Sequence, residues 1–120
     1  MSYQQVDSIQ KKQFCENIYE QNIVKAHEYL KTFIKYSDIL NLKLPISCYT
    51  NFRDSLFHFR RIVMAIDEVE METQAFAVKE HLSRALTDAS ISILDYLFLV
   101  SEKLLKSNDV EVQKKRKFAI

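Results

Sequence analysis

The sequence predicts an all-α protein, an antiparallel bundle of about three long helices plus short pieces. The chain has 120 residues, no glycine and one proline, Pro45. Because glycine supplies the positive φ angles of tight turns and bulges, its absence disfavours sheet-rich folds. Apolar residues also recur every three to four positions, the period of one helix face. This length suits one domain, and we expect a helical domain over residues 1–107 followed by a basic tail over residues 108–120.

The first long helix is expected to begin at a cap near Ser2 or Asp7 and to reach about Asp38. Each candidate cap has a glutamine three residues later, which is the spacing of a capping box. A break is expected just before Pro45, since proline disfavours a helical residue ahead of it. Within the helix, a mainly apolar stripe that should face a core recurs every three to five positions: Phe14, Ile18, Ile23, Ala26, Leu30, Phe33 and Ser37.

The second helix should open at Pro45 or Ser47 and end near Val69, because proline is tolerated in the first turn of a helix. The acidic residues within 67–72 are expected to form a solvated connector whose carboxylates favour the start of the next helix. Residues spaced alternately by three and four positions lie on one face, which we expect to be buried: Tyr49, Phe52, Leu56, Phe59, Val63 and Ile66.

The third helix is predicted from Thr73 to about Ser107 and is the longest. At about 1.5 Å per residue it would span roughly 50 Å, so it should either kink or project beyond the body. Its stripe is unbroken: Ala75, Val78, Leu82, Ala85, Ala89, Ile93, Leu97, Val100 and Leu104. A second apolar row widens the stripe beyond what one neighbouring helix covers, so we expect a homodimer: Leu86, Ile91, Leu94, Phe98 and Leu105.

Composition excludes several common function classes. Without glycine, the chain cannot build the loops that cradle phosphates in P-loop and dinucleotide-binding proteins. Lys and Arg total 17 against 16 Asp and Glu, so only a local patch could hold a nucleic acid. The N-terminus lacks the pattern of a signal peptide, and no stretch is apolar enough to cross a bilayer. We therefore expect a cytoplasmic protein that does not associate with membranes.

Metal binding and thiol chemistry are not expected either. The histidines His27, His58 and His81 lack the spacing of paired metal ligands. Cys15 and Cys48 lack the paired spacing of a zinc site and should be reduced thiols. The sequence therefore predicts neither a metal nor a cofactor.

One short motif indicates chemistry. Arg53, the polar Asp54 and His58 form an Arg-x4-His pattern early in the second predicted helix. This pattern resembles the HEPN superfamily, small and commonly dimeric all-α domains. Their Arg-x4–6-His motif marks metal-independent ribonucleases of toxin–antitoxin, abortive-infection and CRISPR-associated systems. A second run, from His81 to Asp88, resembles a His-Leu-x-Arg-Ala-x-x-Asp pattern of HEPN-like bacterial proteins.

The resemblance implies an RNA-cleaving or RNA-binding protein whose site is carried by Arg53 and His58. RNA supplies its own nucleophile, the 2′-hydroxyl, so cleavage needs only proton transfer and stabilisation of phosphate charge. Histidine can act as general acid or base near neutral pH, and arginine offers a permanent forked charge to phosphoryl oxygens. In the family, two motifs meet across a dimer interface. The implied partners are a second copy of the chain, RNA, and a cognate antitoxin or other partner protein.

Three residues could support this site from the third helix. His81, Arg84 and Asp88 share one helix face, with Arg84 and Asp88 at the spacing of a salt bridge. One interpretation is an ordinary intrahelical pair. The other makes the row a wall that faces the motif and holds Arg53 through Asp88.

The alternative to an RNA site is a surface without chemistry. Asp54, His58 and Arg61 lie at i, i+4 and i+7, and could form an exposed polar row with ordinary ion pairs. The chain would then be a non-catalytic helical interaction or accessory protein, for instance antitoxin-like, whose apolar faces bind a partner helix.

Overall fold

The part of the protein described by the structure, a computed structural model, consists of helices joined by short connections. It describes the backbone of residues 7–118 and the burial of side chains up to residue 108. Over this range the all-α prediction is confirmed, and no strand is present between residues 7 and 118. The elements are α1 (Ser8–Ile18), the π-helix η1 (Tyr19–Val24), α2 (Lys25–Ile39), α3 (Ile46–Met64) and α4 (Glu68–Phe118).

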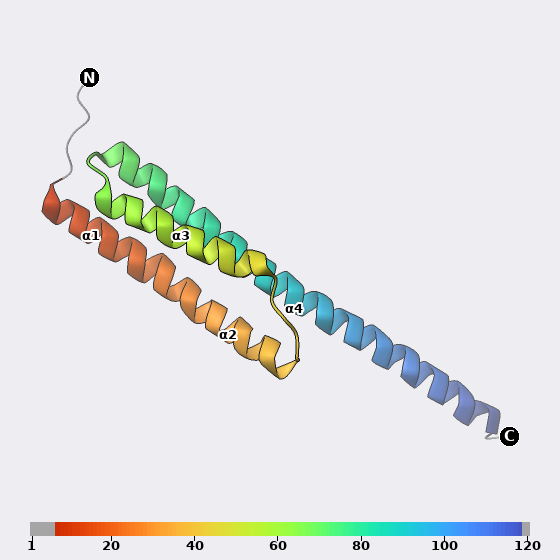
Figure 1. Ribbon diagram of the computed structural model, residues 1–120. Helices are drawn as coiled ribbons and strands as arrows, with labels where there is room; N and C mark the ends of the chain where they lie inside the picture. The colour runs from red at the N-terminus through yellow and green to blue at the C-terminus, as the bar shows by residue number, and fades with distance from the viewer. Residues whose placement is uncertain (1–6, 119–120) are drawn as a thin grey trace.

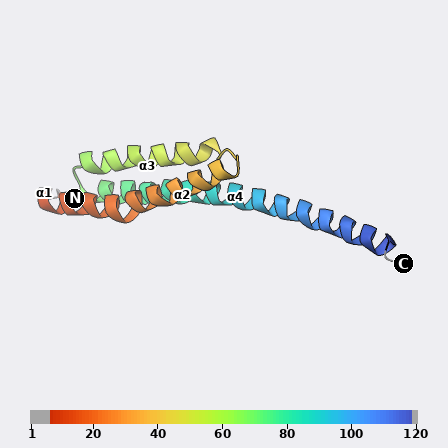
Figure 2. The same ribbon diagram turned by 90° about the horizontal axis from the view of Figure 1, so that it is seen from below.

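Three helical segments lie side by side. The first runs without interruption through α1, η1 and α2, α3 returns antiparallel to it, and α4 reverses again (Figure 1). The molecule measures 87 × 26 × 20 Å, because α4 continues well past the ends of α2 and α3 (Figure 2). We call residues 94–118 the α4 extension and the remainder the body. The sequence analysis expected the longest helix either to kink or to project, and it projects beyond the body.

The first segment starts at Asp7 and contains a π-helical turn. The Asp7 carboxylate accepts a hydrogen bond from the Ile9 amide at 3.1 Å, so Asp7 is the helix cap. The other candidate, Ser2, lies outside the described residues. The apolar stripe has one five-residue step, from Ile18 to Ile23, and η1 occupies that interval. Because a π-turn closes i to i+5, it keeps both isoleucines buried on the same side.

The turn after α2 replaces glycine with asparagine. Asn41 adopts a left-handed φ of 53°, a conformation that asparagine tolerates better than most residues. The Leu42 amide then donates to the Ser37 carbonyl at 2.8 Å, which closes the end of the helix. Pro45 follows and precedes the first residue of α3, Ile46. A chain without glycine therefore still reverses direction here.

The acidic stretch is not a connector, contrary to expectation. The second helix ends at Met64 instead of Val69, and α4 begins at Glu68. The Asp67 carboxylate accepts a hydrogen bond from the Glu70 amide at 2.7 Å and so caps α4. Glu68 and Glu70 lie in the first turn of α4, where the helix dipole stabilises negative charge.

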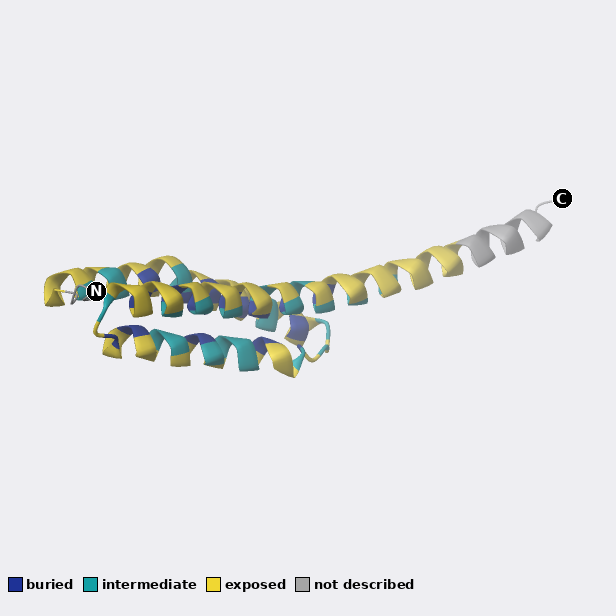
Figure 3. Cartoon of the chain, turned by 90° about the horizontal axis from the view of Figure 1, so that it is seen from above, coloured by how far each residue is buried: buried dark blue, intermediate teal, exposed yellow. Residues whose placement is uncertain are grey.

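The core has two clusters, which together join all three segments. Figure 3 shows the buried positions within the body, whereas the coloured part of the α4 extension is mainly exposed. The first cluster lies between η1, α3 and the start of α4, and its buried residues are Ile18, Ile23, Ala26, Ile62, Ala65, Met71, Ala75, Val78 and Leu82. The second lies at the other end of the body and consists of Leu30, Leu44, Cys48, Ala89 and Ile93.

The buried face of α3 differs from the predicted stripe. Leu56 is 43% exposed, and Tyr49, Val63 and Ile66 are also exposed. The inward face instead consists of Cys48, Ser55 and Ile62. Phe52 and Phe59 are half-buried beside it. Ser55 is fully buried because its hydroxyl donates to the Phe52 carbonyl within the same helix. The large residues define a stripe that is rotated away from α4.

The predicted stripe of α4 is buried only up to Ile93. Beyond it, Leu97 and Leu104 are exposed. The helix also does not end near Ser107 but continues to Phe118, so the expected boundary between domain and tail lies inside it. Residues 108–118 contain neither glycine nor proline, and Lys, Glu and Gln favour helix. Among the described residues, no helix combines the length and apolar character needed to cross a bilayer.

Candidate functional site: a histidine groove between α3 and α4

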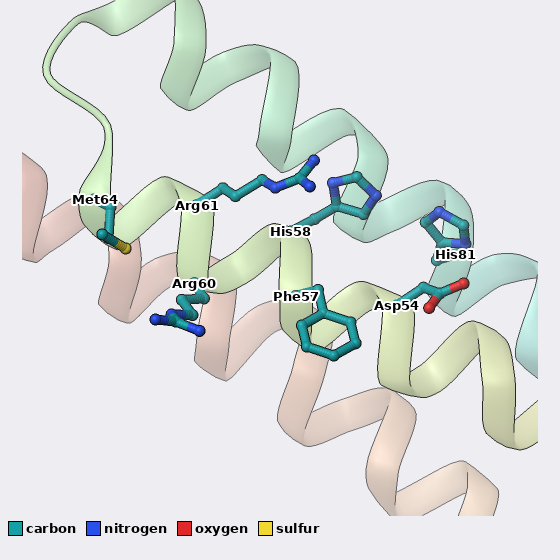
Figure 4. Close-up of a pocket in the computed structure, with 7 residues that line it drawn as sticks. All are labelled: Asp54, Phe57, His58, Arg60, Arg61, Met64 and His81. Carbon is teal, nitrogen blue, oxygen red and sulfur yellow. The ribbon is translucent and has the colours of Figure 1, made fainter.

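An open groove of about 410 Å³ runs along the edge between α3 and α4 (Figure 4). His81 lines it from α4, and all its other lining residues come from α3: Asp54, Phe57, His58, Arg60, Arg61 and Met64. We call it the histidine groove.

The two histidines in this groove form a stacked pair. The ring centroids of His58 and His81 lie 5.1 Å apart, with 16° between the ring planes. Both side chains are half-buried, His58 on the flank of α3 and His81 on the facing flank of α4. The structure therefore brings together two imidazoles that are 23 positions apart in the sequence.

Each imidazole is held by a side-chain amide. His58 Nδ1 lies 2.6 Å from Gln74 Oε1, and His81 Nδ1 lies 2.9 Å from Asn51 Oδ1. The sequence analysis missed both amides. The register of the α3–α4 hairpin could have predicted both pairs. His58 and Gln74 lie eight residues before and after Ile66, and Asn51 and His81 lie fifteen residues before and after it. Residues equally distant from the centre of an antiparallel hairpin face one another.

Arginine supplies the positive charge of the groove. Arg60 and Arg61 line it, and the Arg61 side chain extends toward the His58 ring (Figure 4). Asp54 is the single carboxylate in the lining, and its Oδ1 also lies 3.3 Å from Arg53 Nη2. The local balance therefore favours a bound anion.

Arg53 lies outside the groove that contains His58. Its side chain is exposed, pairs with Asp54, and has its guanidinium carbon 5.9 Å from the centre of the Phe57 ring. Positions i and i+5 are about 140° apart around a helix, so the two motif residues point in different directions. Within one chain, Arg61 lines the groove together with the two histidines, and the motif arginine Arg53 does not.

The three α4 residues that were expected to support the site do not act as one row. His81 enters the groove, but Arg84 forms its ion pair with Glu80, one turn earlier, and not with Asp88. Asp88 does not hold Arg53 either, because Arg53 pairs with its neighbour Asp54. Glu80 lies four residues before Arg84, the favourable order for such a pair.

The two cysteines lie apart from the groove and are free thiols. Burial raises the pKa of Cys48, and the nearby Asp88 carboxylate raises it further. Burial also raises the pKa of Cys15, while the charge of Lys11 opposes that shift. Both thiols are therefore biased toward the protonated, less nucleophilic form.

Over the described residues, no group of three or more His, Cys, Asp or Glu side chains is arranged to hold a metal ion. In comparisons with known proteins, no family model, curated protein or solved structure matches the chain.

Proposed function

We propose that the protein binds single-stranded RNA in the histidine groove and cleaves it without a metal ion, as the resemblance of its Arg-x4-His motif to HEPN domains implies. The observation that carries the proposal is the stacked pair His58–His81 in a groove that Arg60 and Arg61 also line. The proposal includes a HEPN-like antiparallel bundle as the scaffold of this site.

The groove has the groups that RNA cleavage requires. Arginine guanidinium groups bind phosphoryl oxygens through forked, charge-assisted hydrogen bonds. Imidazoles transfer protons near neutral pH, and the RNA 2′-hydroxyl is the nucleophile. Phe57 lies half-exposed in the groove lining and offers a ring on which an unpaired base can stack. Arg53, on the outward side of Asp54, would contact a phosphate farther along the strand.

Dimerisation through the α4 extension is a second part of the proposal. Ile93, Leu97, Val100 and Leu104 have spacings of four, three and four, the pattern of a helix-pairing seam. An apolar groove of about 500 Å³ begins where α2 ends beside α4, and Phe33, Tyr36, Ile39, Leu40, Ser90, Ile93, Leu94 and Leu97 line it. Helices in proteins draw most of their stability from the packing of an apolar face, so we assign this seam to a second copy of the chain.

The same seam favours a second candidate function, that of a helical interaction or accessory protein, such as an antitoxin-like protein. That function needs the apolar face of the extension but not the histidines. The two candidates therefore predict different sensitivities to substitutions in the groove.

The decisive experiment incubates purified protein with mixed single-stranded RNA in excess EDTA. We expect cleavage to 2′,3′-cyclic phosphate ends, because the attacking oxygen belongs to the RNA. His58→Ala should abolish cleavage, and Arg61→Ala should weaken RNA binding at low salt. His27→Asn is the matched control, since His27 is an exposed histidine on α2 outside the groove.

Three outcomes would count against the ribonuclease. EDTA could stop the cleavage, or the double variant Arg53→Ala, His58→Ala could cleave like the wild type. Absence of both cleavage and RNA binding would favour the interaction protein instead.

A further inference from the structure

We infer that His58 and His81 of one chain act together on one phosphodiester, and that Gln74 and Asn51 are positioning residues that fix the tautomer of each imidazole. The inference rests on the proposed RNA function and adds to it a second catalytic histidine and two positioning amides.

The tautomer of neutral His58 follows from a chain of hydrogen bonds. Gln74 Nε2 donates to Glu70 Oε1 at 3.0 Å, so the amide nitrogen faces Glu70 and the amide oxygen faces the ring. An amide oxygen only accepts, so His58 Nδ1 must carry the proton that it donates. The neutral ring therefore has its lone pair on Nε2.

His81 is fixed in the same way from the opposite helix. Asn51 Nδ2 donates to the Ser47 carbonyl at 2.9 Å, which turns the Asn51 oxygen toward His81 Nδ1. His81 Nδ1 is thus also a donor, and its Nε2 also carries the lone pair. Within residues 7–108, neither Nε2 atom has a hydrogen-bond partner in the chain. Both histidines thus have the proton-transfer nitrogen available.

The two rings are placed to share one substrate group. Their centroids lie 5.1 Å apart in nearly parallel planes, and both line the same groove. Hydrogen bonds of about 2.8 Å from two such nitrogens can reach different oxygens of one phosphodiester. The charged groups that line the groove with the pair are Asp54, Arg60 and Arg61 of α3, and Glu70 of α4 lies behind Gln74.

The reaction divides one proton relay between the two rings. A neutral imidazole takes the proton of the RNA 2′-hydroxyl at Nε2 while the 2′-oxygen bonds to phosphorus. The bond from phosphorus to the 5′-oxygen breaks, and that oxygen takes a proton from Nε2 of the other, protonated imidazole. The products are a 2′,3′-cyclic phosphate and a 5′-hydroxyl end. Water returns both histidines to their starting protonation states.

This arrangement differs from the composite site that the HEPN resemblance implies. There, one chain contributes half of a site that a partner completes. Here, α3 and α4 of a single chain supply both imidazoles. Cleavage by the pair should therefore persist in a monomer.

The first test measures tautomers and needs no substrate. Nitrogen-15 correlation spectra of the imidazoles, recorded above neutral pH, should show His58 and His81 with the proton on Nδ1. Gln74→Leu should shift only His58 toward the Nε2–H form, and Asn51→Leu should shift only His81. Gln74→Glu keeps an oxygen acceptor and should restore the His58 signal. Wild-type spectra with both rings in the Nε2–H form would overturn the inference.

The second test measures cleavage of RNA in excess EDTA. Each of His58→Ala and His81→Ala should slow cleavage by roughly 10²- to 10⁴-fold, the usual contribution of a general acid or base. A substrate with sulfur in place of the bridging 5′-oxygen has a leaving group that needs no proton. It should restore the rate of the variant that lacks the acid, and not that of the other. Circular dichroism and melting curves confirm that each variant is folded, with His27→Asn as the histidine control.

The outcomes separate this inference from the proposed function. If His58→Ala abolishes cleavage and folded His81→Ala cleaves like the wild type, the ribonuclease stands and the pair is overturned. If the sulfur substrate restores both variants or neither, the division into acid and base is overturned. If the wild type neither cleaves nor binds RNA, the proposed function fails, even where the tautomer spectra match.

Discussion

The two halves of α4 carry the same apolar face but have different surroundings. From Met71 to Ile93, this face packs against the first segment and α3. Beyond Ile93 it continues through Leu97, Val100 and Leu104, of which Leu97 and Leu104 are exposed. Helical periodicity therefore identifies the apolar side of a helix, but it does not say whether the covering surface belongs to the same chain.

The largest expected effect is on the free energy of unfolding, from a substitution in the half of α4 that packs within the body. Leu82 is 4% exposed and lies in the core cluster shared by all three segments. Leu82→Ala removes buried methyl groups and leaves a cavity, so it should lower the free energy of unfolding by about 2–5 kcal/mol. Denaturant titration monitored by circular dichroism measures this change.

Leu104→Ala is the matched control on the same helix. Leu104 is 60% exposed, and a surface substitution usually changes stability by about 0.5 kcal/mol or less. The comparison requires a protein concentration at which the chain is monomeric. Equal losses from the two substitutions would mean that the extension packs within its own chain.

The next effect concerns association through the extension. Replacing Leu97 and Leu104 together by Asp places two charges on the proposed seam, and burying unpaired charge is costly. Sedimentation equilibrium at tens of micromolar should show a dimer for the wild type and a monomer for this variant. Lys103→Asp adds the same residue on another face and should leave the dimer intact. A wild-type monomer at these concentrations would remove the seam as a self-association surface.

The sequence predicted the first segment well because each local signal agreed with the tertiary packing. Ile18, Ile23, Ala26 and Leu30 are all buried as expected. Even the irregular step between Ile18 and Ile23 has a structural counterpart in η1. The prediction for the acidic stretch was wrong for a local reason. The capping role of Asp67 was not recognised, so Glu68 was assigned to a connector.

The prediction for α3 failed because it excluded a polar residue from the buried face. Leu56 and Val63 continue a regular stripe, yet the inward face contains Ser55 and Ile62. Serine counts as polar in a periodicity argument, although it can be buried when its hydroxyl bonds to its own helix. An inward face that includes such a serine is therefore hard to detect from hydropathy.

The site was only partly predictable, since the motif identified His58 but not its surroundings. His81 was proposed as a supporting residue, and it lies against His58. Gln74 and Asn51 have no distinctive spacing in the sequence. They become neighbours of the histidines only once the register of the α3–α4 hairpin is known.

Within the body, a substitution in the histidine groove should lower stability less than one in the core. His58→Ala loses the hydrogen bond to Gln74 and the ring contact with His81. The loss should cost about 1 kcal/mol, because water can take the place of the hydrogen bond in an open groove. Thermal unfolding should therefore show a folded variant with a slightly lower midpoint. Arg53→Ala, which removes an exposed ion pair, should change stability less still. Unfolding of His58→Ala would make the histidine a core residue and would end the proposal of an RNA site.

The smallest expected effect lies where α3 packs on the buried half of α4. Cys48 contacts the cluster of Ala89 and Ile93, and both burial and the Asp88 charge raise its pKa above the usual value of about 8.5. The unfolded chain therefore loses the thiol proton at a lower pH than the folded chain. The free energy of unfolding should be insensitive to this group below the unfolded pKa, and should fall as the pH rises through that value toward the folded pKa.

Cys48→Ala tests this linkage by difference, because other alkaline titrations are common to the variant and the wild type. Denaturant titrations between pH 7 and pH 10 should give a shallower decline for Cys48→Ala than for the wild type. Cys15→Ala should reduce the decline less, since Lys11 opposes the upward shift of the Cys15 pKa. The extension contains no cysteine, so dimer dissociation should not show this dependence. Parallel stability curves for Cys48→Ala and the wild type would mean that the Cys48 thiol titrates alike in the folded and unfolded chain.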